Sequence, residues 1–237
     1  MTTRDLLGFG LSYFYAAALI GLAESIRRWR GYPQDFTRKL VHIGAGMWVF
    51  GVLAIFEHWY IGIIPFASFI VLNYLFYRSR LLKAIDSLES SPGTIYFAFS
   101  VALLFLLFWR TDSSQDQASL AVAGVMAMTW GDSLAALIGR KWGRHHYAVG
   151  GKTRSLEGSA VMWLASGLTI FLTLWLVPNS PLSSQSPAFS LGTCLSGALV
   201  GSVVATLAEA FAPAGTDNLS VPLLVSFALF GLTSFLR

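Results

Sequence analysis

The chain has 237 residues, of which 55% are hydrophobic and 12% are charged. Soluble domains carry about twice this share of charged residues, so the composition indicates an integral membrane protein. The net charge of +4 is spread over short segments between apolar runs, which argues against a nucleic-acid-binding face. A single cysteine excludes an internal disulfide or a cysteine metal cluster.

Long apolar runs follow one another along the whole chain. Runs of about 17–25 such residues can cross a membrane as helices, and these runs lack the alternation of barrel strands. The sequence therefore predicts an all-α multi-span bundle that forms one polytopic domain over residues 1–237. Some runs are short, so seven or six spans are also compatible with the pattern. The eight expected spans cover residues 5–26, 40–56, 59–77, 94–109, 118–139, 158–177, 191–212 and 219–236.

The cations mark one side of the membrane. Segments 27–39, 78–83 and 140–154 carry five, three and five of the 16 lysines and arginines, and they follow the first, third and fifth expected spans. By the positive-inside rule these segments face the cytoplasm, so both termini are expected outside. Segment 79–94 has leucines and isoleucine at helical spacing and is expected to lie along the cytoplasmic interface.

Polar side chains within the expected spans gather in one half of the membrane. Glu24, His42, Asn73, Asp132 and Glu209 all lie toward the basic side. Charged and polar groups inside a membrane are costly and by default mark a functional site. The asymmetry predicts one polar chamber that opens to the cytoplasm.

Asp132 is the most informative of these residues. It lies in MAMTWGDSLAALIGRKWG (126–143), well inside an apolar span and among small residues. Small residues are explained by close helix packing, but a carboxylate in such a place requires a cation, a proton or a hydrogen-bonding partner. Asp132 is therefore predicted to be functional.

Two basic segments could hold phosphate groups. In TRKLVHIGAG (37–46), Arg38, Lys39 and His42 share one helix face, and the third polar group favours phosphate binding over the alternative of cations at a membrane edge. In GRKWGRHHYAVGGKTRSLEGS (139–159), GGKT resembles the end of a P-loop, but the earlier glycine and a preceding strand are missing. This segment is instead expected to be a flexible basic loop that wraps phosphates, or a positive-inside loop in which Glu157 complements a helix dipole.

A third segment, AEAFAPAGTDNLSVPL (208–223), brings two carboxylates and an amide near a Pro–Gly turn. Oxygen donors of Glu209, Asp217 and Asn218 suit Mg²⁺ that is shared with phosphates. Capping of the last span by Asp217 and Asn218 is an equally good interpretation of the spacing.

These segments together resemble a known family. RKLVHIG, GDSLAALIGRKWG, GGKTRSLEGS and AEAFAPAGTDNLSVPL, in this order, are similar to the motifs of the polyprenol kinases, which include dolichol kinases and phytol kinases and are distantly similar to phosphatidate cytidylyltransferases. The resemblance covers residues 36–237, and the short chain with its DNLSVPL ending favours the phytol kinase branch. It implies transfer of the terminal phosphate of CTP, or of UTP, to an isoprenoid alcohol.

The resemblance, combined with the general chemistry of phosphoryl transfer, assigns roles to the motif residues. The expected magnesium ligands are Asp132, Glu209, Asp217 and Asn218. The expected nucleotide-binding residues are Arg38, Lys39, His42, Gly151, Lys152, Thr153 and Arg154. The expected catalytic residues are Asp132, Lys152 and Glu157, with Asp132 or Glu157 as acceptor of the alcohol proton.

The expected partners are a nucleoside triphosphate, membrane lipid and an isoprenoid alcohol. Phytol is the preferred candidate for the alcohol, and geranylgeraniol and farnesol remain alternatives. A photosynthetic membrane, or a plasma membrane with the catalytic loops in the cytoplasm, is the expected location, and the oligomeric state is open. A cytidylyltransferase acting on a lipid phosphate is the main alternative. A transporter would show polar groups near the midplane and an internal repeat, neither of which is evident.

Overall fold

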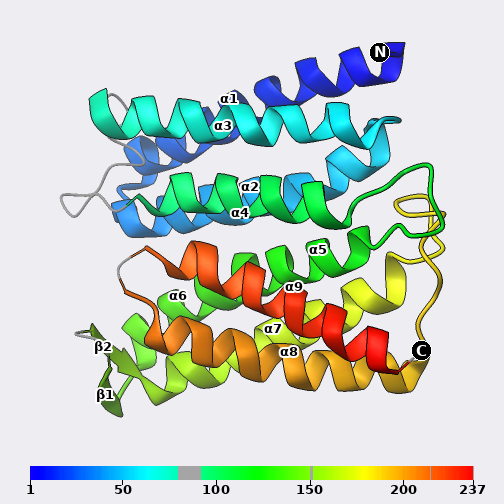
Figure 1. The fold of residues 1–237 in the computed structure, drawn as a ribbon. Coiled ribbons are helices and arrows are strands. Elements are labelled where there is room, and N and C mark those ends of the chain that lie inside the picture. The colour runs from blue at the N-terminus through cyan, green and yellow to red at the C-terminus, as the bar shows by residue number, and fades with distance from the viewer. Residues whose placement is uncertain (80–91, 150–151, 214, 237) are drawn as a thin grey trace.

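The computed structural model describes residues 1–79, 92–149, 152–213 and 215–236, and within these ranges it is a helical bundle with one small hairpin (Figure 1). The expected interfacial segment 79–94 lies for the most part outside the described residues. In chain order the elements are α1 (Thr3–Arg30), α2 (Gln34–Ile55), α3 (Trp59–Ser79), α4 (Gly93–Phe108), α5 (Ala118–Met126), the π-helical segment η1 (Ala127–Asp132), α6 (Ser133–Trp142), β1 (His146–Val149), β2 (Lys152–Ser155), α7 (Leu156–Leu176), α8 (Leu191–Phe211) and α9 (Asp217–Phe235).

The prediction of an all-α multi-span membrane protein is confirmed. Seven helical segments in the described part of the chain are long and apolar enough to cross a membrane, and α4 is a shorter apolar helix of 16 residues. The eight expected spans correspond to these elements, because α5, η1 and α6 form one continuous crossing. Both termini lie at the same end of the bundle, and the hairpin lies at the opposite end (Figure 1).

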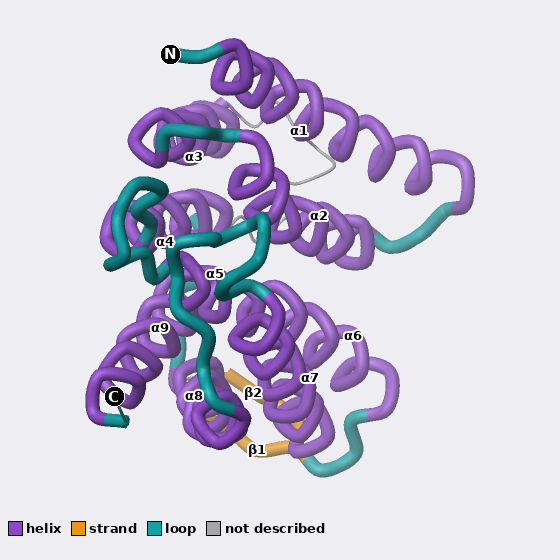
Figure 2. The backbone as a smooth tube through the Cα atoms, turned by 90° about the vertical axis from the view of Figure 1, so that its right-hand side faces the viewer, coloured by secondary structure: helices purple, strands orange, loops and turns teal. Residues whose placement is uncertain are grey.

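The helices form two groups. Helix α1 packs on α2, and α3 packs on α4. Helix α8 packs on both α7 and α9, and all three contact the α5–α6 crossing. Figure 2 shows the first group above the second, with α5 between them. Contacts of α4 with α5 and α9, and of α2 with η1, join the two groups.

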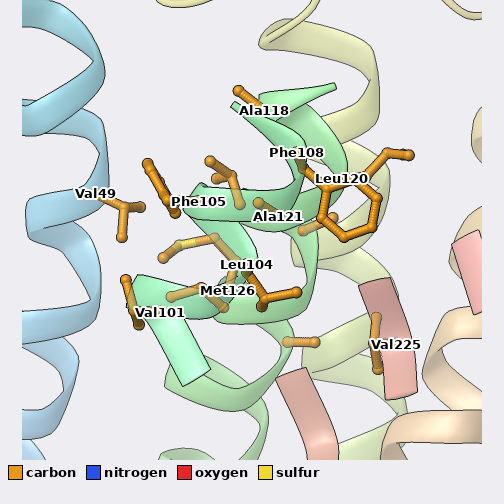
Figure 3. Close-up of a cluster of buried hydrophobic side chains, with 14 of the residues drawn as sticks. Val49, Val101, Leu104, Phe105, Phe108, Ala118, Leu120, Ala121, Met126 and Val225 are labelled. Carbon is orange, nitrogen blue, oxygen red and sulfur yellow. The ribbon is translucent and has the colours of Figure 1, made fainter. Parts of the chain in front are cut away.

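Helix α5 forms the centre of the bundle. All nine of its residues are buried, and most are alanine, glycine, valine or serine, so neighbouring helices approach its backbone closely. Figure 3 shows larger side chains of α4, among them Leu104, Phe105 and Phe108, packed around this helix. By contrast, large apolar side chains remain exposed along the outer faces of α1, α7 and α8, as expected for helices that face lipid.

A Gly124→Ala substitution is expected to destabilise the fold by about 1–3 kcal/mol, because a close-packed core resists added volume. A Cβ atom at Gly124 would lie 2.4 Å from the backbone oxygen of Pro222 and 2.2 Å from Oγ of Ser226. Thermal unfolding in detergent measures this loss. Gly10→Ala is the control, since nothing lies within 4 Å of a Cβ there; equal unfolding temperatures for the two variants would contradict the prediction.

The basic segment between α6 and α7 differs from the expected flexible loop. It contains an antiparallel hairpin in which Val149 pairs with Lys152 and His146 pairs with Ser155. In a strand, alternate side chains point to opposite faces. Lys152 and Arg154 are accordingly half-buried, whereas Thr153 between them is exposed.

Candidate active site

A cavity of about 430 Å³ lies between α1, α2, α3 and α4 and extends to η1, β2 and the start of α9. Its polar lining is concentrated where these last three elements meet α2, so this part is called the polar mouth. The mouth is at the hairpin end of the bundle, which is the end that carries the basic segments (Figure 1). The sequence-predicted residues that line the cavity are Arg38, Lys39, His42, Asp132, Lys152, Asp217 and Asn218.

Asp132 is the last residue of η1 and is buried against α2. A π-helical turn inside an α-helix is frequently found at a functional site. Lys39 donates a hydrogen bond to the Asp132 carboxylate and forms an ion pair with it, with both side chains nearly buried. Lys39 is thus one partner of the kind that a buried carboxylate requires, and the pair joins the two helix groups.

His42 lies one helical turn from Lys39 on the same face of α2. Its Nε2 atom is buried and has no hydrogen-bond partner among the described residues, and its ring packs on Phe97 with the centroids 4.6 Å apart. A buried polar atom without a hydrogen-bond partner lowers the stability of the fold unless a bound ligand supplies the hydrogen bond. Arg38 also lines the cavity, 3.4 Å from Asp35.

Asp217 and Asn218 begin α9 on the other side of the mouth. Oδ1 of Asp217 accepts hydrogen bonds from the backbone and side-chain amides of Asn218, at 2.9 and 3.2 Å. Ser100 of α4 donates to the Asn218 carbonyl at 2.9 Å, which fixes the start of α9. Lys152 lines the same mouth and makes no ion pair with any described residue.

Arg154 and Glu209 are brought together, but away from the cavity lining. They form a nearly buried ion pair, and Arg154 also donates to the Ala212 carbonyl at 3.5 Å. This pair attaches β2 to the end of α8. Because Lys152 lies two residues before Arg154 on the same face of the strand, the pair fixes the part of the hairpin that presents Lys152 to the mouth.

The remaining candidates lie elsewhere. Glu157 accepts hydrogen bonds from the backbone and ring of His145, the ring bond being 2.7 Å long, and it does not line the cavity. Thr153 is exposed on the outer face of the hairpin. Gly151 lies outside the described residues.

The sequence was also compared with known proteins. No family model matches the chain. It is 34% identical over 218 residues to a phytol kinase of Synechocystis sp. The aligned region covers 92% of this chain and 88% of that protein. The chain belongs to the polyprenol kinase family. It is accordingly a lipid kinase.

Plant members of the family are more distant but span most of the chain. This kinase is 25% identical to a probable chloroplastic phytol kinase of Glycine max, over 92% of this chain and 70% of that protein. It is 23% identical to a chloroplastic farnesol kinase of Arabidopsis thaliana, over 95% of this chain and 76% of that protein.

The four-residue magnesium site expected from the sequence is not assembled in the described residues. No group of three or more Asp, Glu, His or Cys side chains in this part of the chain could hold a metal, and Glu209 is engaged by Arg154. Mg²⁺ in nucleotide sites needs only one or two carboxylates in addition to substrate phosphates and water. The oxygens of Asp217 and Asn218, with Asp132 in the same cavity, fit this smaller requirement.

Buried carboxylates at the opposite end of the kinase have structural partners. Asp5 accepts hydrogen bonds from backbone amides and from His58, and Asp116 accepts them from backbone amides and from Ser183. Burial raises the pKa of the Asp116 carboxyl, while these hydrogen bonds oppose the shift. Asp132 differs because it faces a cavity, and the structure therefore separates structural carboxylates from the candidate site.

Proposed function

We propose that this kinase transfers the terminal phosphate of CTP to the hydroxyl group of an isoprenoid alcohol, with phytol as the first candidate and Mg²⁺ bound to the nucleotide phosphates. One observation carries the proposal: a single cavity combines a charged mouth with an apolar interior. The relatives named phytol kinase and farnesol kinase support an alcohol of this class.

The charges of the mouth suit a nucleoside triphosphate. Arg38, Lys39 and Lys152 line it together with the carboxylates of Asp132 and Asp217, so cations are in excess. Catalysis of phosphoryl transfer consists mostly of positioning and neutralising charge. Lys152 has no ion pair with a described residue, so it is the cation best suited to neutralise charge on the transferred group.

The two carboxylates receive different roles in this proposal. Asp217 and Asn218 would hold Mg²⁺, which would neutralise charge on the phosphates when bound. Asp132, oriented by Lys39, accepts the proton of the alcohol. The alcohol oxygen forms a bond to the terminal phosphorus, the bond from that phosphorus to the bridging oxygen breaks, and CDP leaves. Glu157, the other sequence-predicted acceptor, lies outside the cavity lining.

The membrane arrangement follows from the basic segments. By the positive-inside rule these segments support a cytoplasmic mouth, and in this proposal the soluble nucleotide enters there. The alcohol is dissolved in the bilayer and reaches the same cavity from its apolar part. UTP is the second candidate donor.

An assay of the purified protein in detergent, with phytol, Mg²⁺ and CTP labelled on the terminal phosphate, tests the proposal. Transfer of label into the lipid fraction is the expected result. Release of labelled pyrophosphate, with CMP joined to an added lipid phosphate, would identify a cytidylyltransferase instead. Absence of turnover with every alcohol and lipid phosphate would favour transport.

Substitution of Lys152 by glutamine is expected to lower kcat by about 10²–10³-fold, the loss typical for removal of one group that stabilises transition-state charge. Lys141→Gln is the matched control, because Lys141 is exposed and contacts the Trp142 ring rather than the cavity. The same radiolabel assay compares both variants. An equal effect of the two substitutions would show that only the overall positive charge of this face matters.

A further inference from the structure

Helix α1 carries none of the family motifs, yet it forms a wall of the cavity. Ser12, Tyr15, Ala16, Leu19 and Ile20 all line it. Their spacing of three and four residues places them on one face of the helix. The same pattern recurs on α2, α3 and α4, whose lining residues also follow one helical face. The cavity is therefore a chamber that runs along four helices.

Beyond His42 the chamber wall is mostly aromatic and aliphatic. Because neighbouring helices α1, α2, α3 and α4 alternate in direction, the lining residues farthest from the mouth are Ser12, Trp48, Phe66 and Val101. Nε1 of Trp48 donates to Oγ of Ser12 at 3.1 Å. Tyr15 stacks on Trp48 with ring centroids 4.4 Å apart, and its hydroxyl donates to the Gly44 carbonyl at 2.8 Å. These contacts hold Trp48 as a fixed floor.

The depth of the chamber follows from helix geometry. Trp48 at the floor lies nine positions after Lys39 at the mouth, which corresponds to about 13–14 Å along α2 at a rise of about 1.5 Å per residue. An extended carbon chain advances about 1.2 Å per bond, so one isoprene unit needs roughly 5 Å. The chamber therefore holds about three extended isoprene units below the reacting oxygen.

We infer that this chamber binds the isoprenoid tail of the acceptor and that its floor, Trp48 held by Ser12 and Tyr15, sets the preferred tail length. The inference rests on the proposed function for the identity of the head group. The residues of the floor and wall then act as specificity determinants, separate from the charged residues that act on phosphate. Three extended units are enclosed, and the fourth unit of a tail such as that of phytol or geranylgeraniol must bend at the floor.

The first test narrows the chamber above its floor. Ala45 lines the cavity six residues from Lys39, so a phenylalanine there leaves about 9 Å, enough for roughly two isoprene units. Ala45→Phe is expected to lower the ratio of turnover with geranylgeraniol to turnover with geraniol at least about tenfold. Ala54→Phe is the matched control on the same helix, because Ala54 is exposed outside the cavity, and its ratio is expected to match the wild type.

The second test deepens the chamber. Trp48→Leu removes the ring that forms the floor, so the ratio of turnover with geranylgeraniol to turnover with farnesol is expected to rise above the wild-type ratio. If Ala45→Phe is inactive even with geraniol, its turnover ratio cannot be measured, and Trp48→Leu then tests whether the floor sets the tail length. An unchanged ratio in Trp48→Leu, or in an Ala45→Phe variant that still turns over geraniol, would overturn the inference.

A binding measurement separates the tail site from the chemistry. Geranylgeraniol without nucleotide is expected to raise the unfolding temperature of the wild type in detergent, since a ligand that binds only the native state stabilises it. The rise should be smaller for Ala45→Phe and unchanged for Ala54→Phe. If no prenol is phosphorylated but these shifts appear, the proposed function fails and the chamber stands; equal shifts in all three proteins refute the chamber.

Discussion

The folded Asp132→Asn variant is expected to lose kinase activity by about 10²–10³-fold, because the substitution removes a charge that acts on the reacting groups. The variant is also expected to be less stable, because a nearly buried ion pair loses one partner. Asparagine has nearly the same shape as aspartate, so the packing around η1 is preserved. It cannot accept the alcohol proton, and it leaves Lys39 without its anionic partner. Turnover of labelled CTP with phytol, normalised to the folded fraction, measures the effect.

Asp116→Asn is the control for this experiment. Asp116 is also a buried carboxylate, but it lies in the loop before α5 and accepts hydrogen bonds from Ser183 and from backbone amides. It does not line the cavity. Its replacement is expected to change thermal stability and to leave the turnover of the folded protein near the wild-type value. Full activity of Asp132→Asn would remove Asp132 from the mechanism.

The membrane spans could be predicted from the sequence because the bilayer sets their length and hydropathy locally. The fifth expected span, 118–139, is an example: the structure has one continuous crossing from Ala118 to Trp142. The change to π-helical geometry at Ala127–Asp132 within it has no comparable local signal. The polar mouth was also foreseeable, since Lys39 and Asp132 both lie toward the basic side of the bilayer.

The hairpin was missed although a signal for it was present. Gly150 and Gly151 separate two short runs that contain Tyr147, Val149 and Thr153, and a Gly–Gly pair between such runs favours a two-residue hairpin turn. The many cations around the glycine pair led to the prediction of a flexible loop instead. Alternation along β2 then explains why Lys152 reaches the cavity whereas the adjacent Thr153 does not.

The partners of the buried charges could not be read from the sequence. Arg154 and Glu209 were expected to bind phosphate and metal, and nothing in their local sequence shows that they face each other across the end of α8. Pairing of opposite charges depends on tertiary packing over long separations. The tail chamber could not be predicted from the sequence either, because the face of α1 that lines it, including Tyr15 and Ala16, carries only common apolar and small residues.

Breaking the ion pair of Arg154 and Glu209 is expected to reduce both the stability and the activity of the protein. Removing one partner of a nearly buried pair leaves an uncompensated charge, so Arg154→Ala is expected to destabilise the protein by about 3–5 kcal/mol. It should also lower activity by about 10²-fold, because the strand that presents Lys152 loses its attachment to α8 and small displacements of a catalytic group are costly. Thermal unfolding and the radiolabel assay measure the two effects on the same sample.

The double variant Arg154→Gln/Glu209→Gln distinguishes a positioning role from a direct one. Two neutral amides carry no unpaired charge and can form a hydrogen bond with each other. Most of the stability that Arg154→Ala loses should therefore be retained in the double variant, since substitutions of contacting residues are not additive. If the pair only attaches the hairpin, activity should return with stability to within about tenfold of the wild type. If Glu209 instead binds Mg²⁺ and Arg154 binds phosphate, as their sequence motifs predict, the double variant will be stable and inactive. The two roles therefore differ in whether activity follows stability.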